Sequence, residues 1–99
     1  MKRTVSIAFL LAVCCVADLS AGQNQEKVTL VPIAGPVYML QGSGGNVGIV
    51  ADPAGILMID AMEEASAPQI RAVIKPLPGG DRVRILINTH WHGDHTDGN

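Results

Sequence analysis

The sequence predicts an α/β fold, and three observations support this prediction. Short apolar segments separated by turns rich in glycine and proline fill residues 28–60, which indicates a meander of strands. One amphipathic helix follows, with apolar side chains at helical spacing. A further apolar strand, Val83–Ile87, comes next. The succession strand, helix, strand is typical of an α/β layer arrangement with a crossover connection.

The first two strands are predicted at Val28–Ile33 and Val37–Gln41, on either side of Ala34-Gly35-Pro36. Proline has no backbone N–H to donate to a neighbouring strand, and Pro32 lies inside the first of these segments. We therefore expect the first strand at the edge of the sheet.

Two turns join the following strands. Gly42-Ser-Gly-Gly45 lacks the Lys-Ser/Thr ending of a nucleotide-binding loop. It leads into the strand-like segment Asn46–Ala51 rather than into a helix, which favours a hairpin turn over a phosphate site. Asp52-Pro-Ala-Gly55 has the residue preferences of a type I turn. Ile56–Asp60 then returns as an apolar strand.

The helix is predicted to begin after Ser66, since Ser66 and Gln69 match the S-x-x-Q pattern of a capping box. Its apolar stripe consists of Ile70, Val73, Ile74 and Leu77. Prolines and glycines at 76–80 end it. Val83–Ile87 is so apolar that we expect this strand to be buried on both faces.

Residues 1–21 are predicted to be a secretory signal peptide rather than part of the fold. A positive start at Lys2-Arg3 is followed by an apolar run over 5–16 and by small residues up to Ala21. The run is shorter than the roughly 20 residues that a spanning helix needs. We expect cleavage after Ala21, with Ala17 as the weaker alternative, and a mature segment of residues 22–99.

Two other interpretations of the start of the chain are an uncleaved N-terminal anchor and a lipoprotein cut before Cys14. The bulky Val13 disfavours the second. The two cysteines, Cys14 and Cys15, leave with the signal peptide, so the mature segment has no thiol. We expect a periplasmic or extracellular protein.

The composition excludes several classes of protein. The chain is 47% hydrophobic and 16% charged, which argues against disorder. It has 7 lysines and arginines against 9 aspartates and glutamates, with no basic stretch for nucleic acid. Nothing in the mature segment attracts an acidic membrane surface. The expected partner is a small-molecule substrate, and the oligomeric state is not indicated.

All three histidines lie within six residues, in His90-Trp-His-Gly-Asp-His95. In an extended segment His90 and His92 point to the same side, so that two imidazoles can converge on one ion. Trp91 then points away and is expected to pack. Gly93 permits a change of direction that aims Asp94 and His95 at a neighbouring position. Imidazole and carboxylate ligands together suit zinc, with iron or manganese as alternatives.

This segment resembles a known signature. His90-x-His92-x-Asp94-His95, within Asn88–Thr96, is similar to the motif of the metallo-β-lactamase superfamily. Members of that family begin with a strand meander and end a strand in an aspartate, the position that Asp60 occupies. The resemblance covers residues 28–99. It implies the N-terminal half of a metallo-β-lactamase-type αββα sandwich, which is a partial domain of residues 22–99 after the signal peptide.

The resemblance also implies a role for each residue. His90 and His92 would bind a first metal ion, and Asp94 and His95 a second. Asp94 would in addition be catalytic, by forming a hydrogen bond to the attacking water. Asp60 would accept a proton from a ligand histidine and fix its orientation. The substrate-binding residues remain unknown.

The implied activity is that of a zinc-dependent hydrolase with one or two ions. The metal activates a hydroxide, which attacks an ester, lactam, lactone or thioester. The family site needs further histidines and an aspartate beyond Asn99, so we expect this chain to be an inactive N-terminal fragment. The alternative is a non-catalytic, secreted metal-binding or interaction fragment.

Overall fold

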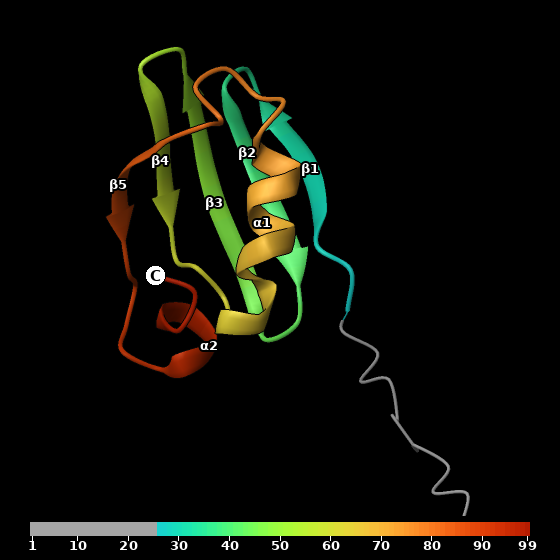
Figure 1. The fold of residues 1–99 in the computed structure, drawn as a ribbon, viewed down its shortest axis with the longest axis vertical. Coiled ribbons are helices and arrows are strands. Elements are labelled where there is room, and N and C mark those ends of the chain that lie inside the picture. Colours follow the sequence, from blue (N-terminus) through green and yellow to red (C-terminus); the bar gives the residue numbers. More distant parts are fainter. Residues whose placement is uncertain (1–25) are drawn as a thin grey trace, which may run out of the picture.

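The computed structural model describes residues 26–99, so the predicted signal peptide and both cysteines lie outside the described residues. Five strands form one sheet in sequence order (Figure 1): β1 (Thr29–Ala34), β2 (Val37–Gly42), β3 (Gly45–Asp52), β4 (Gly55–Ile59) and β5 (Val83–Ile87). The first four strands form an antiparallel meander, whereas β5 runs parallel to β4. The parallel pair requires a crossover, which passes through the 3-10 helix η1 (Glu64–Ser66) and α1 (Ala67–Ile74).

A short helix, α2 (Gly93–Thr96), follows β5. The mixed α/β arrangement agrees with the prediction, while the second sheet of a sandwich remains a prediction because residues 26–99 form one sheet. None of the helices in this part of the chain is long and apolar enough to cross a membrane.

The positions of the predicted turns are confirmed. β2 and β3 are joined through Ser43-Gly44, and Gly44 has a φ of +84°, a conformation that glycine adopts without strain. At the next turn, the Asp52 carboxylate accepts a hydrogen bond of 2.8 Å from the backbone N–H of Ala54. Pro32 lies on β1, which is an edge strand as expected.

One face of the sheet is covered by α1 and holds the core. The stripe of α1 contributes Ile70 and Ile74, both buried, with Val73 and Leu77 at its margin. They pack against buried side chains of the meander, namely Leu40, Val47, Ile49, Ile56 and Met58. The predicted stripe is therefore confirmed as the contact between helix and sheet.

The predicted capping box is wrong. Because η1 precedes α1, Ser66 already has helical backbone angles (φ −82°, ψ −17°), and its side chain makes no capping hydrogen bond. Gln69 instead accepts a hydrogen bond of 2.9 Å from the backbone N–H of Val28. This contact ties the residue before β1 to the first turn of α1.

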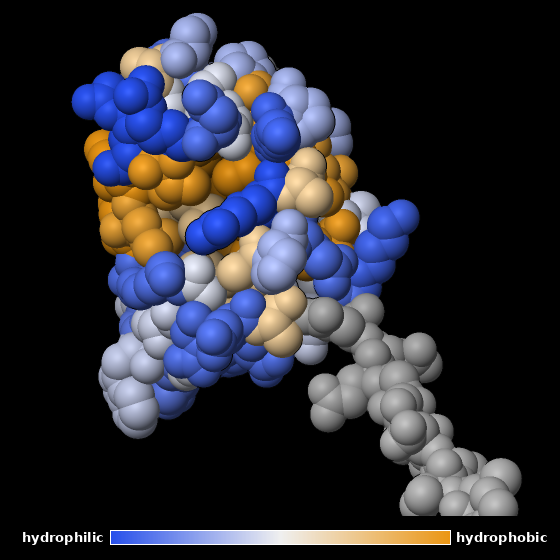
Figure 2. Space-filling view, viewed as in Figure 1, coloured by the Kyte–Doolittle hydropathy of each residue, from blue (hydrophilic) through white to orange (hydrophobic). Residues whose placement is uncertain are grey.

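The prediction that β5 is buried on both faces is also wrong. Ile85 is 51% exposed and Ile87 is 49% exposed. β5 is the outer strand, and among residues 26–99 no element covers the face of the sheet opposite α1. On the α1 side, Leu86 packs against the core, and an open groove of about 160 Å³ separates β5 from α1. Figure 2 shows the hydrophobic surface beside α1 at this place.

Candidate metal centre

The predicted site residues gather at one edge of the sheet. Asp60 directly follows β4, and Asn88-Thr89 directly follow β5. Because these strands are parallel, their carboxyl ends lie at the same edge, where α2 also lies (Figure 1). The backbone N–H of Asp60 donates to Ile87 at 2.8 Å, so the ends of the two strands are held together.

Asp60 is a buried carboxylate, 5% exposed, with a φ of +65°. It accepts hydrogen bonds from the backbone N–H of Thr89 at 2.7 Å and from the Thr89 hydroxyl at 2.8 Å. Its Oδ2 also lies 2.9 Å from Nδ1 of His95. A left-handed backbone is strained for a residue with a side chain, and these three contacts hold it in place.

The electrostatic environment keeps Asp60 ionised. Burial raises the pKa of its carboxyl, but the hydrogen bond from the Thr89 N–H, the hydrogen bonds from His95 and the Thr89 hydroxyl, and the electrostatic attraction of the His95 ring together lower that pKa by more. The net pKa lies below the ordinary value of an aspartate. An ionised carboxylate only accepts, so Nδ1 of His95 must carry the proton in this contact.

Three predicted ligands come together on the Nε2 side of the His95 ring. Ligand atoms of His90, Asp94 and His95 all lie within 4.8 Å of one another. The rings of His90 and His95 are 4.0 Å apart between centroids, and Nε2 of His95 lies 3.5 Å from Oδ2 of Asp94. Two imidazoles and one carboxylate at this separation fit the donor preferences of zinc, iron or manganese.

His92 lies beside this group rather than in it. Its ring is 4.8 Å from the His90 ring between centroids, edge to face. The chain bends at Thr89–Trp91, so the alternation of an extended segment does not apply there. Its assignment as a ligand stays a prediction. The expectation that Trp91 packs is wrong within the described residues, since this side chain is 82% exposed and touches the His92 ring.

The glycine-rich turn lies against the cluster, a contact that the sequence analysis missed. A Cβ atom on Gly44 would stand 3.0 Å from Cβ of Asp94, and one on Gly45 would stand 3.3 Å from Cε1 of His95. The turn between β2 and β3 can approach Asp94 and His95 this closely because it has no side chains there. Gly44 and Gly45 were the sequence signal for this close approach, but they were interpreted only as a hairpin turn.

The backbone of α2 is fixed on the loop that follows Asp60. The carbonyl of His95 accepts hydrogen bonds of 2.9 Å from the backbone N–H of Ala61 and from the side-chain amide of Asn88. The N–H of Gly98 donates to Met62 at 3.0 Å. A Cβ on Gly98 would overlap the Ala61 carbonyl oxygen, so only glycine fits there. Asn88 and Thr89 were recognised as part of the motif, but their contacts were not predicted.

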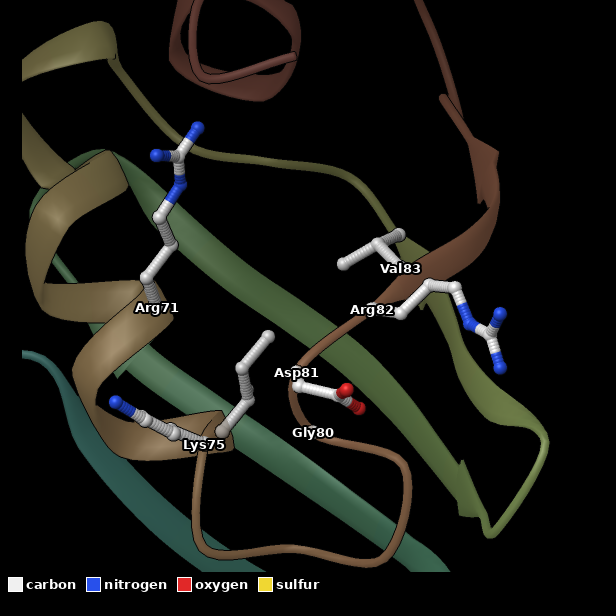
Figure 3. Close-up of a pocket in the computed structure, with 7 residues that line it drawn as sticks. Arg71, Lys75, Gly80, Asp81, Arg82 and Val83 are labelled. Carbon is white, nitrogen blue, oxygen red and sulfur yellow. The ribbon is translucent and has the colours of Figure 1, made fainter.

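A separate cavity of about 610 Å³ opens between the end of α1 and the start of β5 (Figure 3). It is lined by Arg71, Ile74, Lys75, Gly80, Asp81, Arg82 and Val83. None of the predicted site residues lines this cavity, and Figure 3 shows the Arg82 side chain directed away from Arg71 and Lys75. The cavity is therefore separate from the histidine cluster.

Comparisons with known proteins agree with the site. The model of the metallo-beta-lactamase superfamily matches residues 40–99, which include every residue of the cluster. The chain is also similar to the atrochrysone carboxyl ACP thioesterase of Aspergillus fumigatus, 33% identical over 88 residues that cover 78% of this chain and 20% of the relative. The chain thus spans about a fifth of that relative's length. No solved structure matches significantly. The chain belongs to the metallo-beta-lactamase superfamily.

Proposed function

We propose that this chain carries the metal-binding part of a zinc-dependent hydrolase. The observation that supports the proposal best is the convergence of His90, Asp94 and His95 within 4.8 Å, at the carboxyl ends of two parallel strands. The resemblance to the metallo-β-lactamase superfamily implies a metallohydrolase. Two imidazoles and one carboxylate are ligands suited to zinc. Zinc is preferred, with iron or manganese as alternatives, and one or two ions are bound.

Each residue then has a task. His90 and His95 would bind the ion through imidazole nitrogens, with His92 as a further ligand. Asp94 would ligate and accept a hydrogen bond from the attacking water. Asp60, behind His95, would keep that ring in one orientation. When bound, zinc lowers the pKa of water toward neutrality and polarises the oxygen of the scissile group.

For the substrate, we propose a thioester as the first candidate. The support is the relative's name, an acyl carrier protein thioesterase, at 33% identity. Esters, lactones and β-lactams remain the other candidates, because the same attack on a polarised carbonyl serves all of them. The chain spans 20% of that relative, so the activity of the whole protein is part of the proposal.

The second candidate is a secreted metal-binding fragment without turnover. The observation that favours it is the small number of ligands: among residues 26–99 the group has three members, of which His90 is exposed. A partly exposed site of this kind can bind metal, but it does not exclude water from the ion. The 99 residues by themselves are expected to behave in this way.

The encoding DNA beyond the Asn99 codon decides between the two candidates. A hydrolase predicts an open reading frame with further histidines and an aspartate, whose product hydrolyses an acyl thioester, a lactone or a β-lactam. Asp94→Asn should abolish that turnover. A complete reading frame whose product binds zinc and leaves every compound of the panel intact would overturn the hydrolase in favour of the metal-binding fragment.

We further propose export, on the basis of the first 21 residues. The expected mature chain begins between residues 18 and 23 and is found in the periplasm or outside the cell. Mass spectrometry of the expressed protein tests this proposal. A soluble cytoplasmic species that retains Met1 or Lys2 would overturn it.

A further inference from the structure

The Thr89 hydroxyl lies between the buried carboxylate and a second histidine. Its Oγ1 is 2.8 Å from Oδ2 of Asp60 and 2.9 Å from Nδ1 of His90. The backbone N–H of the same residue donates to Asp60 at 2.7 Å. Thr89 is therefore held against Asp60 by two separate contacts, and its hydroxyl has a defined position relative to the His90 ring.

A count of protons assigns the direction of each hydrogen bond. A hydroxyl has one proton to donate, and an ionised carboxylate can only accept. The Thr89 O–H must therefore donate to Asp60 if that contact is a hydrogen bond. The remaining lone pairs of Oγ1 can then only accept, so Nδ1 of His90 carries the proton in the contact with Thr89.

We propose that Thr89 is a positioning residue that relays the orienting effect of Asp60 to His90. Asp60 selects the Nδ1–H tautomer of His95 directly, at 2.9 Å, and selects the same tautomer of His90 through the Thr89 hydroxyl. Both imidazoles then present an unprotonated Nε2. One buried carboxylate in this way prepares two ligands for the same centre.

This inference rests on the proposed metal site but concerns the protein without metal. In the Nε2–H tautomer, the nitrogen that faces an ion would be blocked by a proton, and binding would require a tautomer change. A fixed hydrogen bond from the other ring nitrogen removes that step and orients the ring as well. If the role of Thr89 were only structural, its backbone N–H would hold the loop, and its hydroxyl would have no influence on the tautomer of His90.

The histidine tautomers of the metal-free protein can be measured by long-range proton–nitrogen NMR of the chain labelled with ¹⁵N-histidine. The measurement is made at about pH 8, above the ordinary histidine pKa of about 6.5. In the natural chain we expect the proton on Nδ1 in both His90 and His95. Thr89→Val keeps the shape and removes the hydroxyl, and should shift His90 toward Nε2–H while His95 stays unchanged. Thr89→Ser keeps the hydroxyl and should restore the natural pattern.

Zinc titration of the same variants gives the second readout. Thr89→Val should weaken zinc binding by about 10–100-fold, the usual effect of losing a group that orients a ligand. Thr89→Ser should stay within a few-fold of the natural chain. His95 is the internal control, because its tautomer depends on Asp60 and not on the hydroxyl.

Three results would overturn the inference: an Nε2–H tautomer of His90 in the natural chain, an unchanged His90 in Thr89→Val, or an equal change in His95. If Thr89→Val does not fold, the first result alone still decides. Failure of the proposed function can be distinguished from failure of the Thr89 relay. A natural chain that binds no zinc would end the proposed function with the tautomer pattern intact, whereas zinc binding that ignores Thr89→Val would end only the relay.

Discussion

The face of the sheet under α1 and the edge of the sheet beside α2 are held together by different forces. Under α1, the side chains of Leu40, Val47 and Ile70 are buried and apolar, and none of them has a hydrogen bond to satisfy. At the edge, the buried group is the Asp60 carboxylate, and polar contacts to Thr89 and His95 fix it. Apolar burial is nondirectional, whereas these hydrogen bonds set the direction of particular atoms.

We therefore expect the apolar contacts under α1 to determine the stability of the fold, and the polar contacts at the edge to determine the geometry of the metal site. Loss of an apolar contact under α1 should weaken the whole fold and leave the geometry of the edge intact in the molecules that remain folded. Loss of a polar contact at the edge should change metal binding more than it changes stability. Four substitutions test this separation, in order of decreasing effect.

Ile70→Ala should give the largest effect, a loss of about 2–5 kcal/mol in the free energy of unfolding. Ile70 is 4% exposed and lies in the core between α1 and the sheet, so the substitution leaves a cavity. Urea denaturation followed by circular dichroism measures the change. A loss below about 0.5 kcal/mol, the size of a surface effect, would mean that α1 does not pack on the sheet in this way.

Asp60→Asn should weaken zinc binding by about 10–100-fold, because an amide cannot replace the negative acceptor at His95. Its contacts with Thr89 would also be reduced in strength, as the group is no longer charged. Zinc titration measures the change. Asp52→Asn is the control, since Asp52 ends β3 and its carboxylate accepts a hydrogen bond from the Ala54 N–H in the following turn. Equal zinc affinity in both variants would contradict the role of Asp60.

Gly44→Ala should cost about 1–2 kcal/mol of stability, since the residue has a φ of +84°. It should also displace Asp94, whose Cβ would lie 3.0 Å from the new methyl group, and so weaken zinc binding. Gly35→Ala is the matched control: its φ is +50°, but a Cβ there meets nothing within 4 Å. If both variants lose zinc affinity equally, backbone strain rather than contact with Asp94 is the cause.

Ile85→Ala should have the smallest effect, within about 0.5 kcal/mol in the free energy of unfolding. The residue is 51% exposed on the outer strand β5, so little burial is lost. Ile85→Ala is the counterpart of Ile70→Ala: both remove an isoleucine side chain, but Ile70 is buried between α1 and the sheet, whereas Ile85 lies on the uncovered face. A loss as large as that of Ile70→Ala would show that the exposed face is covered in solution.

Local patterns predicted those parts of the fold that depend on neighbours in the sequence. The turn at Ser43-Gly44 depends on glycine, and the edge position of Pro32 on a missing N–H. The helix stripe with Ile70 and Ile74 depends on spacing alone. Each of these features has its cause within a few residues, which is why the sequence sufficed.

Features with distant causes were not predictable in this way. The apolar run of β5 indicates a strand, but its burial depends on what lies across the sheet. The pattern at Ser66 and Gln69 matched a capping box, yet Gln69 is engaged by Val28, 41 positions away. At the site, the ligand types were evident from the motif. The relay through Thr89 requires Asp60, 29 positions earlier, to be brought next to it.

Zinc titration of the natural chain, His90→Ala and Asp94→Asn by calorimetry tests the central claim most directly. Zinc should bind the natural chain near neutral pH, and this binding should weaken as the solution is acidified, because histidines bind metal only when unprotonated. His90→Ala should abolish this binding, and Asp94→Asn should weaken it strongly or remove one ion where two are bound. Zinc uptake that is equal in all three proteins would contradict a metal centre at the ends of β4 and β5.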